Sequence, residues 1–249
     1  MRLFTALLLT LASSLALAAP QGKEIHYSDG KTEFHGYLAW DDSSKGARPG
    51  VLVVHEWWGH NAYARKRADM LAQRGYVALA VDMYGKGEHT GDPAHARHMM
   101  QAATADPAVT LQRFVAALDT LKAQPQADRE HMAAIGYCFG GGVVLNMARA
   151  GIDLDGVVSF HGSLATATPA VAGKTSARVL VYNGADDSYV TPEQVGAFNQ
   201  EMAAAKVDYR FINLPGAKHG FSNPDATGMG SQLQMDIAYD ATADQSSWA

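Results

Sequence analysis

The chain contains a single cysteine, Cys138, and its neighbours are of the types that present a nucleophile to a substrate. Glycines stand at positions 136, 140 and 141, in the run Gly-Tyr-Cys-Phe-Gly-Gly. In a strand-to-helix turn of the G-x-S-x-G type, glycines lack the Cβ that would stop the backbone folding over itself, so the central side chain is exposed at the tip. The sequence therefore predicts a nucleophile elbow with a thiol in place of the usual hydroxyl.

The segments on both sides of Cys138 agree with such a turn. Residues 132–135 are an apolar run typical of a buried strand, and residues 143–150 have the pattern of a helix that ends at Gly151. Two alternatives are a cysteine that only fills space in the core and a glycine-rich phosphate cradle. A core cysteine does not need flanking glycines, and the Gly-Lys-Ser/Thr ending of a phosphate loop is absent, so we favour the nucleophile.

A thiol needs a base to become a thiolate, and a histidine base needs an acceptor that fixes its tautomer and stabilises its charged form. His219 alone among the ten histidines follows the last predicted strand in a glycine-rich loop. Asp186 and Asp187 follow the preceding predicted strand, which gives the chain order nucleophile, acid, histidine of α/β-hydrolase triads. We predict that Asp187 is the acceptor, with Asp186 as the alternative.

The elements that must position these residues alternate along the chain. Alternating polar and apolar residues predict strands at residues 24–27 and 32–40, and apolar runs predict strands at residues 50–56, 76–82, 132–135, 177–184 and 209–214 and a strand with its loop at residues 154–162. Helical spacing predicts helices at residues 62–74, 94–103, 108–123, 143–150 and 191–205. This order predicts an α/β fold, the α/β-hydrolase fold, with a mostly parallel sheet and helices on both faces. Ligands of such folds bind outside the carboxyl ends of the strands, where all the candidate residues fall.

The first residues have the character of an export signal. Arg2 precedes an apolar run over residues 3–17, and Ala16-Leu17-Ala18 supplies small residues for cleavage. We predict a signal peptide over residues 1–18 and a mature protein that is periplasmic or secreted; a retained membrane anchor is the alternative. One cysteine cannot form an internal disulfide in such a compartment.

Composition limits the partners of the mature chain. Residues 19–249 contain no repeat and no composition break, so we predict a single domain. The net charge is −5, and no cluster of lysine and arginine is interleaved with aromatic residues, which argues against nucleic acid as a partner. We expect a monomer that acts on a small molecule and does not bind a membrane after signal removal.

Four segments resemble the dienelactone hydrolase family, whose members are carboxymethylenebutenolidase-like enzymes of the α/β-hydrolase superfamily. These segments are the elbow around Cys138, the run Val54 to Asn61, the turn Asp82 to Gly85 and the loop Gly216 to Phe221. The resemblance extends from about Glu24 to the C-terminus. It implies a catalytic triad of Cys138, Asp187 and His219.

The resemblance also implies roles for residues after the third strand. Glu56 would take the thiol proton as substrate binds, and the backbone N–H groups of Phe139 and Trp57 would form the oxyanion hole. Burial beside Trp57 and Trp58 would raise the pKa of a carboxyl at the Glu56 position, in agreement with that role. The alternative for Glu56 is a salt bridge to a nearby lysine or arginine.

The expected substrate-binding residues are Tyr84, Trp58 and Lys86, and here the chain departs from the family pattern. The family's best-known members have arginine at the position of Lys86 and serine at the position of Gly220, which hold the dienelactone carboxylate. Lysine loses the bidentate fork of arginine, and glycine offers no hydroxyl. The chain has the residues that the family uses for hydrolysis, but the differences at Lys86 and Gly220 leave the identity of the substrate open.

The last segment, residues 232–249, resembles the start of the family's last helix, which normally continues with apolar residues. We expect a truncated or unusually short last helix that leaves part of the sheet less well covered.

Together these features predict a hydrolase that cleaves an ester or lactone through a thioester at Cys138, without a metal or organic cofactor. The pairs His95/His98 and His55/His60 are spaced like metal ligands but lack a third ligand at a telling spacing. One alternative is a protein that binds a small molecule in the same pocket without turnover. A thiol redox sensor is disfavoured because the chain has no resolving cysteine.

Overall fold

The computed structural model describes residues 21–43 and 45–249, so the predicted signal peptide lies outside the described residues. The elements follow one another in the order β1 (Gln21–Ser28), β2 (Glu33–Trp40), β3 (Arg48–Val54), α1 (Ala62–Ala72), β4 (Val77–Val81), α2 (Pro93–Thr104), α3 (Pro107–Lys122), β5 (Ala127–Tyr137), α4 (Phe139–Ala150), β6 (Gly156–Phe160), β7 (Arg178–Gly184), α5 (Pro192–Ala204), β8 (Tyr209–Leu214), α6 (Ala226–Leu233) and α7 (Ala241–Trp248). No helix in this part of the chain is long and apolar enough to cross a bilayer.

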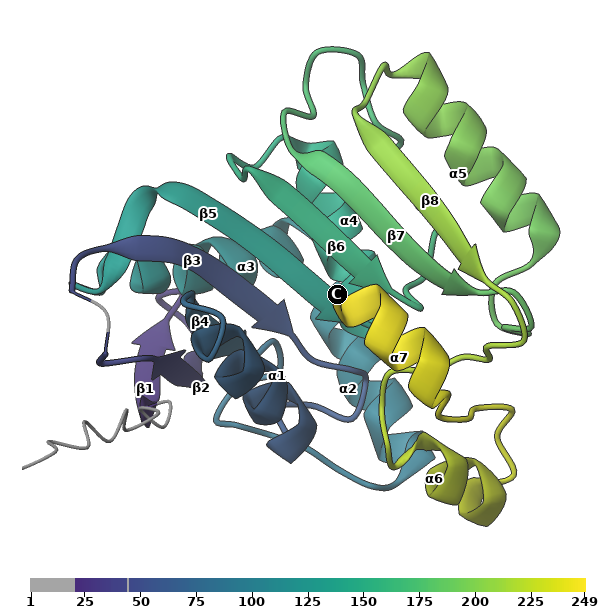
Figure 1. The fold of residues 1–249 in the computed structure, drawn as a ribbon, viewed down its shortest axis with the longest axis horizontal. Coiled ribbons are helices and arrows are strands. Elements are labelled where there is room, and N and C mark those ends of the chain that lie inside the picture. The colour runs from purple at the N-terminus through teal and green to yellow at the C-terminus, as the bar shows by residue number, and fades with distance from the viewer. Residues whose placement is uncertain (1–20, 44) are drawn as a thin grey trace, which may run out of the picture.

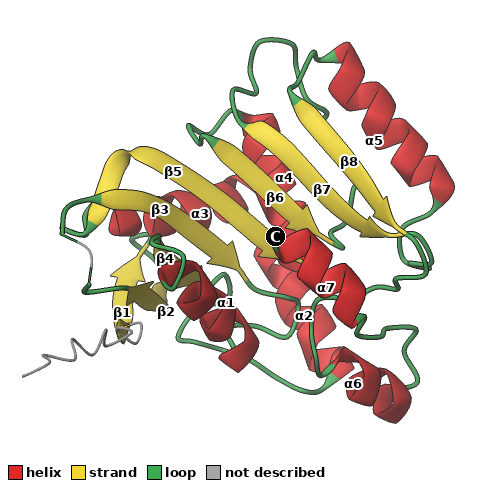
Figure 2. Ribbon diagram, in the orientation of Figure 1, coloured by secondary structure: helices red, strands yellow, loops and turns green. Residues whose placement is uncertain are grey.

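The strands form one eight-stranded sheet in the order β1-β2-β4-β3-β5-β6-β7-β8. The pairs β1–β2 and β2–β4 are antiparallel, and all the other neighbouring strands are parallel (Figure 2). The prediction of a mostly parallel sheet is therefore confirmed. Because the parallel strands point the same way, the loops that follow them gather at one edge of the sheet.

Each face of the sheet has its own core, and β3 shows how the two are divided. Val51 and Val53 belong to a core cluster that includes residues of α1 and α7, whereas Leu52 and Val54 belong to the other cluster, which includes residues of α3, α4 and α5. This alternation follows from the two-residue period of a strand. Figure 1 shows α1 and α7 in front of the sheet and α3 and α4 behind it, which confirms the prediction of helices on both faces.

Side-chain caps fix where several helices begin. The side chains of Asp92 and Asp106 accept backbone N–H bonds at the starts of α2 and α3, and a proline follows each of them. Thr191 and Gln194 form a reciprocal capping box at the start of α5. At the other end of α4, Gly151 takes a left-handed conformation that ends the helix.

The C-terminal segment differs from the prediction. Instead of one helix that starts near residue 232, the structure has α6, which ends at Leu233, and α7, which begins at Ala241 after its cap Asp240. Two glycines within α6, Gly228 and Gly230, weaken its helical pattern in the sequence. The ring of Trp248 in α7 packs against that of Phe160 on the face that α1 also covers.

A buried arginine attaches α7 to the rest of the fold. The Arg67 side chain on α1 is only 3% exposed, and its Nη2 donates to Asp244 Oδ1 at 2.5 Å and to the Ser222 carbonyl at 2.6 Å. Its guanidinium also lies 4.9–5.3 Å from the ring centres of Tyr63, Tyr137 and Trp248. One side chain therefore joins α1, α7 and the loop after β8.

We expect Asp244→Asn to lower the free energy of unfolding by about 3 kcal/mol, because it removes the charge that compensates a buried guanidinium. Urea denaturation measures this loss. Asp236→Asn is the matched control, since Asp236 pairs with Lys218 and both side chains are about half exposed. That control should cost less than about 1 kcal/mol. Equal small losses for the two variants would contradict the anchoring role of Arg67.

Candidate active site

Cys138 lies at the tip of the turn between β5 and α4 and is partly buried. Its backbone has φ 51° and ψ −114°, a conformation that non-glycine residues rarely adopt. A Cβ at position 136 would come closer than 3.0 Å to the backbone of Gly140, and one at position 140 would meet the backbone of Val54 just as closely. The strained turn and its two obligatory glycines have the geometry predicted from the sequence.

The structure brings the predicted base and acid together beside the elbow. His219 follows β8 and Asp187 follows β7, and His219 Nδ1 lies 2.9 Å from Asp187 Oδ2. Asp187 is buried, and its Oδ1 also accepts the N–H of Tyr189 at 2.8 Å. Asp186 is exposed, and its own N–H donates to the Ala217 carbonyl. The carboxylate at His219 is therefore Asp187.

His219 is held in its charged form by its neighbours. Burial by itself lowers the pKa of the imidazole, but the charge of the Cys138 sulfur and hydrogen bonds to Asp187 and Cys138 outweigh it and raise the pKa well above its usual range. Since Nδ1 is engaged by Asp187, Nε2 is left for the sulfur. A charged imidazole ring therefore lies next to the Cys138 sulfur.

Glu56 follows β3 and is 5% exposed. Burial raises the pKa of its carboxyl from 4.5 to about 7, although a hydrogen bond from Asn223 Nδ2 to Oε2, 2.6 Å long, opposes the shift. No lysine or arginine in the described part of the chain forms an ion pair with Glu56, so the alternative of a salt bridge is not found. Nothing in the sequence pattern pointed to Asn223, a polar residue in a loop.

The two backbone groups predicted to form the oxyanion hole are both without acceptors. Among residues 21–43 and 45–249, neither the Phe139 nor the Trp57 N–H has a hydrogen-bond acceptor. Phe139 is the first residue of α4, where an N–H has no partner within the helix and the helix dipole is positive. The Trp57 segment is held in place because Tyr84 Oη donates to the Trp57 carbonyl at 2.9 Å.

A buried polar network lies behind the loop that carries His219. The ring of His161 contacts the His219 ring edge-on, with centres 5.0 Å apart, and its Nε2 lies 2.8 Å from Ser222 Oγ. Ser222 Oγ is also 2.8 Å from Tyr63 Oη, which accepts a hydrogen bond from Arg67 Nε. Burial lowers the pKa of His161 well below its usual range, so the ring is neutral.

Ser222 lies between two functional positions. His219 stands three residues before it, and Asn223, the partner of Glu56, follows directly. Fixing Ser222 therefore positions both the candidate base and the candidate glutamate. His161 and Ser222 were not predicted from the sequence, because their roles depend on how the loops after β6 and β8 meet.

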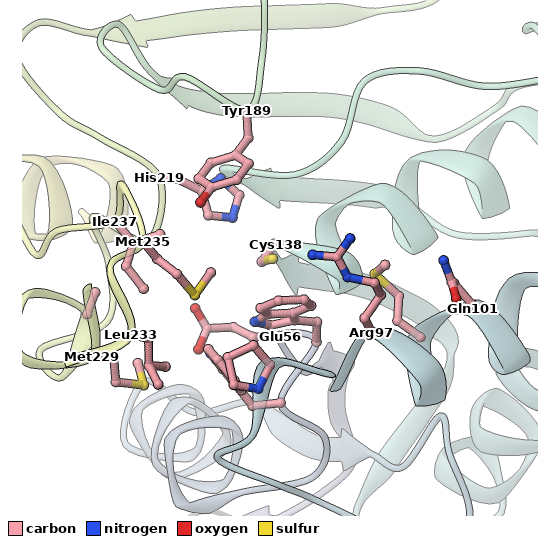
Figure 3. Close-up of a pocket in the computed structure, with 16 residues that line it drawn as sticks. Glu56, Arg97, Gln101, Cys138, Tyr189, His219, Met229, Leu233, Met235 and Ile237 are labelled. Carbon is pink, nitrogen blue, oxygen red and sulfur yellow. The ribbon is translucent and has the colours of Figure 1, made fainter. Parts of the chain in front are cut away.

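A cavity of about 620 Å³ opens above Cys138 (Figure 3). Besides Glu56 and His219, its wall contains Trp57 and Trp58, as predicted. Most of the remaining wall is apolar and comes from α2, from α6 and from the segment after α6, with the side chains Met100, Met229, Leu233, Met235 and Ile237. These residues were not predicted from the sequence.

Lys86 and Tyr84 were predicted to bind substrate, but neither lines this cavity. The turn that carries them is folded around Asp82, whose carboxylate accepts the N–H groups of Tyr84 and Gly87. Lys86 is exposed and its N–H donates to the Glu33 carbonyl of β2. Tyr84 contributes indirectly, because its hydroxyl donates a hydrogen bond to the Trp57 carbonyl.

The histidine pairs singled out in the sequence do not form metal centres with the cavity. His55 is buried between the Glu56 carbonyl and the Met83 N–H, and His60 accepts from Arg65. His95 and His98 line a separate cavity of about 200 Å³. Within the described ranges, one group has ligand atoms close enough for a metal, the exposed Glu24, His26 and His35 of the β1–β2 hairpin.

We expect Gly140→Ala to lower the free energy of unfolding by about 3 kcal/mol, because the added Cβ would push the start of α4 away from β3. Gly142→Ala, in the same helix, is the control, since its Cβ meets Ser163 at an ordinary 3.4 Å. Alanine is also the better helix former there. Thermal or urea unfolding of both variants checks this, and similar stabilities would show that the close approach is not required.

We expect Glu56→Gln to change the pH dependence of stability. The folded state holds the Glu56 proton more tightly than the unfolded chain, so the free energy of unfolding falls as pH rises from 4.5 to about 7. The variant lacks this fall. Its free energy of unfolding relative to that of the parent should therefore rise by about 3 kcal/mol between about pH 4 and about pH 8. Denaturant titrations measure it, with the exposed Glu130→Gln as control; a constant difference would contradict the burial argument.

Comparison with known proteins agrees with this architecture. The chain matches the "Dienelactone hydrolase family" over residues 34–249. It is 27% identical over 201 residues to a Synechocystis sp. protein named as a candidate carboxymethylenebutenolidase, covering 75% of this chain and 80% of that protein. A solved structure of a dienelactone hydrolase-like promiscuous phosphotriesterase from metagenomic libraries superimposes with a TM-score of 0.86 at 40% identity, covering 92% of this chain and 95% of that one. The Anabaena variabilis dienelactone hydrolase shares the fold, with a TM-score of 0.61 at 24% identity over 87% of this chain and 95% of that one. The chain therefore belongs to the dienelactone hydrolase family and is a hydrolase of ester or lactone bonds.

Proposed function

We propose that this hydrolase works through a thioester at Cys138, with His219 and Asp187 completing the triad and Glu56 assisting. The observation that carries the proposal is the position of His219, which Asp187 holds at 2.9 Å while the opposite side of the ring faces the sulfur. A buried acid, a histidine and a nucleophile in this order are the parts that covalent acyl transfer requires.

In the first half of the reaction, the Cys138 thiolate attacks the carbonyl carbon of the substrate. The carbonyl oxygen becomes an oxyanion that accepts hydrogen bonds from the free N–H groups of Phe139 and Trp57. Each donor stabilises the transition state by about 3 kcal/mol. When the intermediate collapses, the bond to the leaving alkoxide breaks. His219 gives that oxygen its proton, which leaves a thioester on the enzyme.

In the second half, water takes the place of the leaving group. His219, now neutral, accepts a proton from the water as its oxygen attacks the thioester carbon. The carbon–sulfur bond then breaks, which releases the acid and returns the thiolate beside an imidazolium. Asp187 stays ionised throughout and keeps the ring in the orientation that both halves use.

Glu56 supplies a second proton acceptor in the same cavity. A carboxyl with a pKa of about 7 is matched to proton exchange near neutral pH. We propose that Glu56 accepts the proton of Cys138 in those molecules where Cys138 is still a thiol when substrate binds. The hydrogen bond from Asn223 Nδ2 to Oε2 holds the Glu56 carboxylate in place during that exchange.

Two further parts of the proposal concern the N-terminus and the assembly state of the chain. The cleavable signal predicted over residues 1–18 makes the enzyme periplasmic or secreted. We further propose that it acts as a single-domain monomer on small molecules. Size-exclusion chromatography and N-terminal analysis of the exported protein test these two points.

A second candidate substrate class comes from the relative at 40% identity, which is named as a promiscuous phosphotriesterase. A thiolate that attacks a carbonyl carbon can also attack the phosphorus of a neutral triester, with the same histidine to protonate the leaving group. Turnover of an aryl dialkyl phosphate that depends on Cys138 would support this activity in the present chain.

We expect Cys138→Ala to reduce hydrolysis of 4-nitrophenyl acetate and simple lactones by about a thousandfold or more, because the nucleophile is lost. Asp187→Asn should cost about ten-thousandfold through loss of the correct tautomer, while Asp186→Asn, its neighbour outside the site, should keep the parent rate. Mass spectrometry of the enzyme quenched during turnover should show the acyl group on Cys138.

Equal rates for Cys138→Ala and the parent would exclude the thioester route. A parent that binds these esters saturably but hydrolyses none, with binding unchanged in Cys138→Ala, would instead identify a binding protein that uses the same cavity.

A further inference from the structure

One residue of the cavity wall has no part in the proposed reaction, namely Arg97 on α2. Among the described residues that line the cavity, it alone carries a permanent positive charge. Arg97 is exposed, and within residues 21–43 and 45–249 it forms no ion pair or hydrogen bond. A guanidinium on a mostly apolar wall, without an anion from the protein, is free to bind one from a substrate.

The helix geometry directs this charge into the cavity. Pro93, Arg97, Met100 and Gln101 all line the cavity, and their spacing of four, seven and eight residues defines one face of α2. In Figure 3 the Arg97 guanidinium extends from α2 toward Cys138. The planar fork of arginine matches a carboxylate better than the single ammonium of a lysine does.

The positions of His219 and Arg97 decide which part of a substrate would meet the charge. Figure 3 shows them on opposite sides of Cys138, with Met235 and Ile237 on the His219 side. The leaving group must lie near His219, since that residue gives it a proton. The acyl part of the substrate therefore extends toward α2 and Arg97, while an apolar alcohol faces the methionine-rich wall.

From this geometry we propose that Arg97 binds an anionic group on the acyl part of the substrate, which makes it a specificity-determining residue. The substrate class is an ester of a dicarboxylic acid with one carboxylate free and an apolar alcohol on the other. The inference rests on the proposed function, because it takes Cys138 and His219 as nucleophile and acid. Gln101, one helical turn beyond Arg97, offers further amide donors to the same anion.

The experiment compares two esters that differ only in charge. One series consists of mono-4-nitrophenyl esters of adipic, pimelic and suberic acids, whose chains are too long for rapid attack by their own carboxylate. The second series carries a primary amide in place of the free carboxylate. The readout is the ratio of kcat/KM for the anionic ester to that for its amide, so a loss common to both cancels.

We expect Arg97→Gln to lower this ratio by about tenfold, as for the loss of a charge-assisted hydrogen bond. Arg97→Lys should restore part of it, and Arg97→Glu should lower it further. Added salt should lower the ratio of the parent but not that of Arg97→Gln. Because Arg97 is exposed, none of these substitutions removes a buried contact.

Two charge-matched controls lie outside the cavity. Lys86→Gln tests the position that the sequence favoured, and Arg178→Gln removes an exposed charge on β7; both should keep the parent ratio. An unchanged ratio in Arg97→Gln, or a lowered ratio in Lys86→Gln instead, would overturn the inference while Cys138-dependent hydrolysis of the amide esters stands. Failure of the parent to hydrolyse either series would count against the proposed function itself.

Discussion

The site depends on one close approach between backbones, where the start of α4 lies against the end of β3. The Gly140 N–H donates to the His55 carbonyl at 3.1 Å, and there is no room for a Cβ at position 140. This contact sets the Phe139 N–H beside the segment that carries Trp57. The two candidate oxyanion donors come from parts of the chain more than eighty residues apart, and this hydrogen bond holds them in register.

His55 makes the same junction rigid in a second direction. Its Nδ1 is bound to the Glu56 carbonyl and its Nε2 accepts the Met83 N–H, which links the ends of β3 and β4. Burial lowers the pKa of His55, so a neutral ring can accept and donate at once. A histidine spaced like a metal ligand thus serves as a structural bridge beneath the candidate glutamate. On the opposite side, Arg67 and Ser222 fix the His219 loop, so both walls of the site are held by buried polar groups rather than by packing alone.

The sequence was sufficient for those parts of the site that depend on local geometry. Cys138 is recognisable because the elbow requires glycines within a few residues, and Asp187 and His219 because each directly follows a strand. The sequence did not identify Asn223, Ser222 or Arg97, because their roles depend on which segments meet after folding. The family resemblance predicted Lys86 at the substrate, whereas hydrogen bonds to Asp82 and Glu33 turn its segment away from the cavity. The eight strands were all recognised, from alternating or apolar runs, but α6 was not, since its glycines obscure the helical pattern.

Burial alone does not explain the pKa values in the cavity. Glu56 and His219 are both buried, but their partners change the effect of burial on each pKa differently. Glu56 has an uncharged partner, Asn223, so desolvation prevails and its pKa rises to about 7. His219 is desolvated as well, which by itself would make it neutral, but the charges of Asp187 and the sulfur reverse the outcome. The difference lies in whether each partner carries a charge, since an ion is stabilised in a low-dielectric site only by another ion or by several aligned hydrogen bonds. At neutral pH the cavity therefore holds a charged His219 next to a Glu56 carboxyl that readily gains or loses its proton. The uncharged amide at position 223 keeps the pKa of that carboxyl near neutrality.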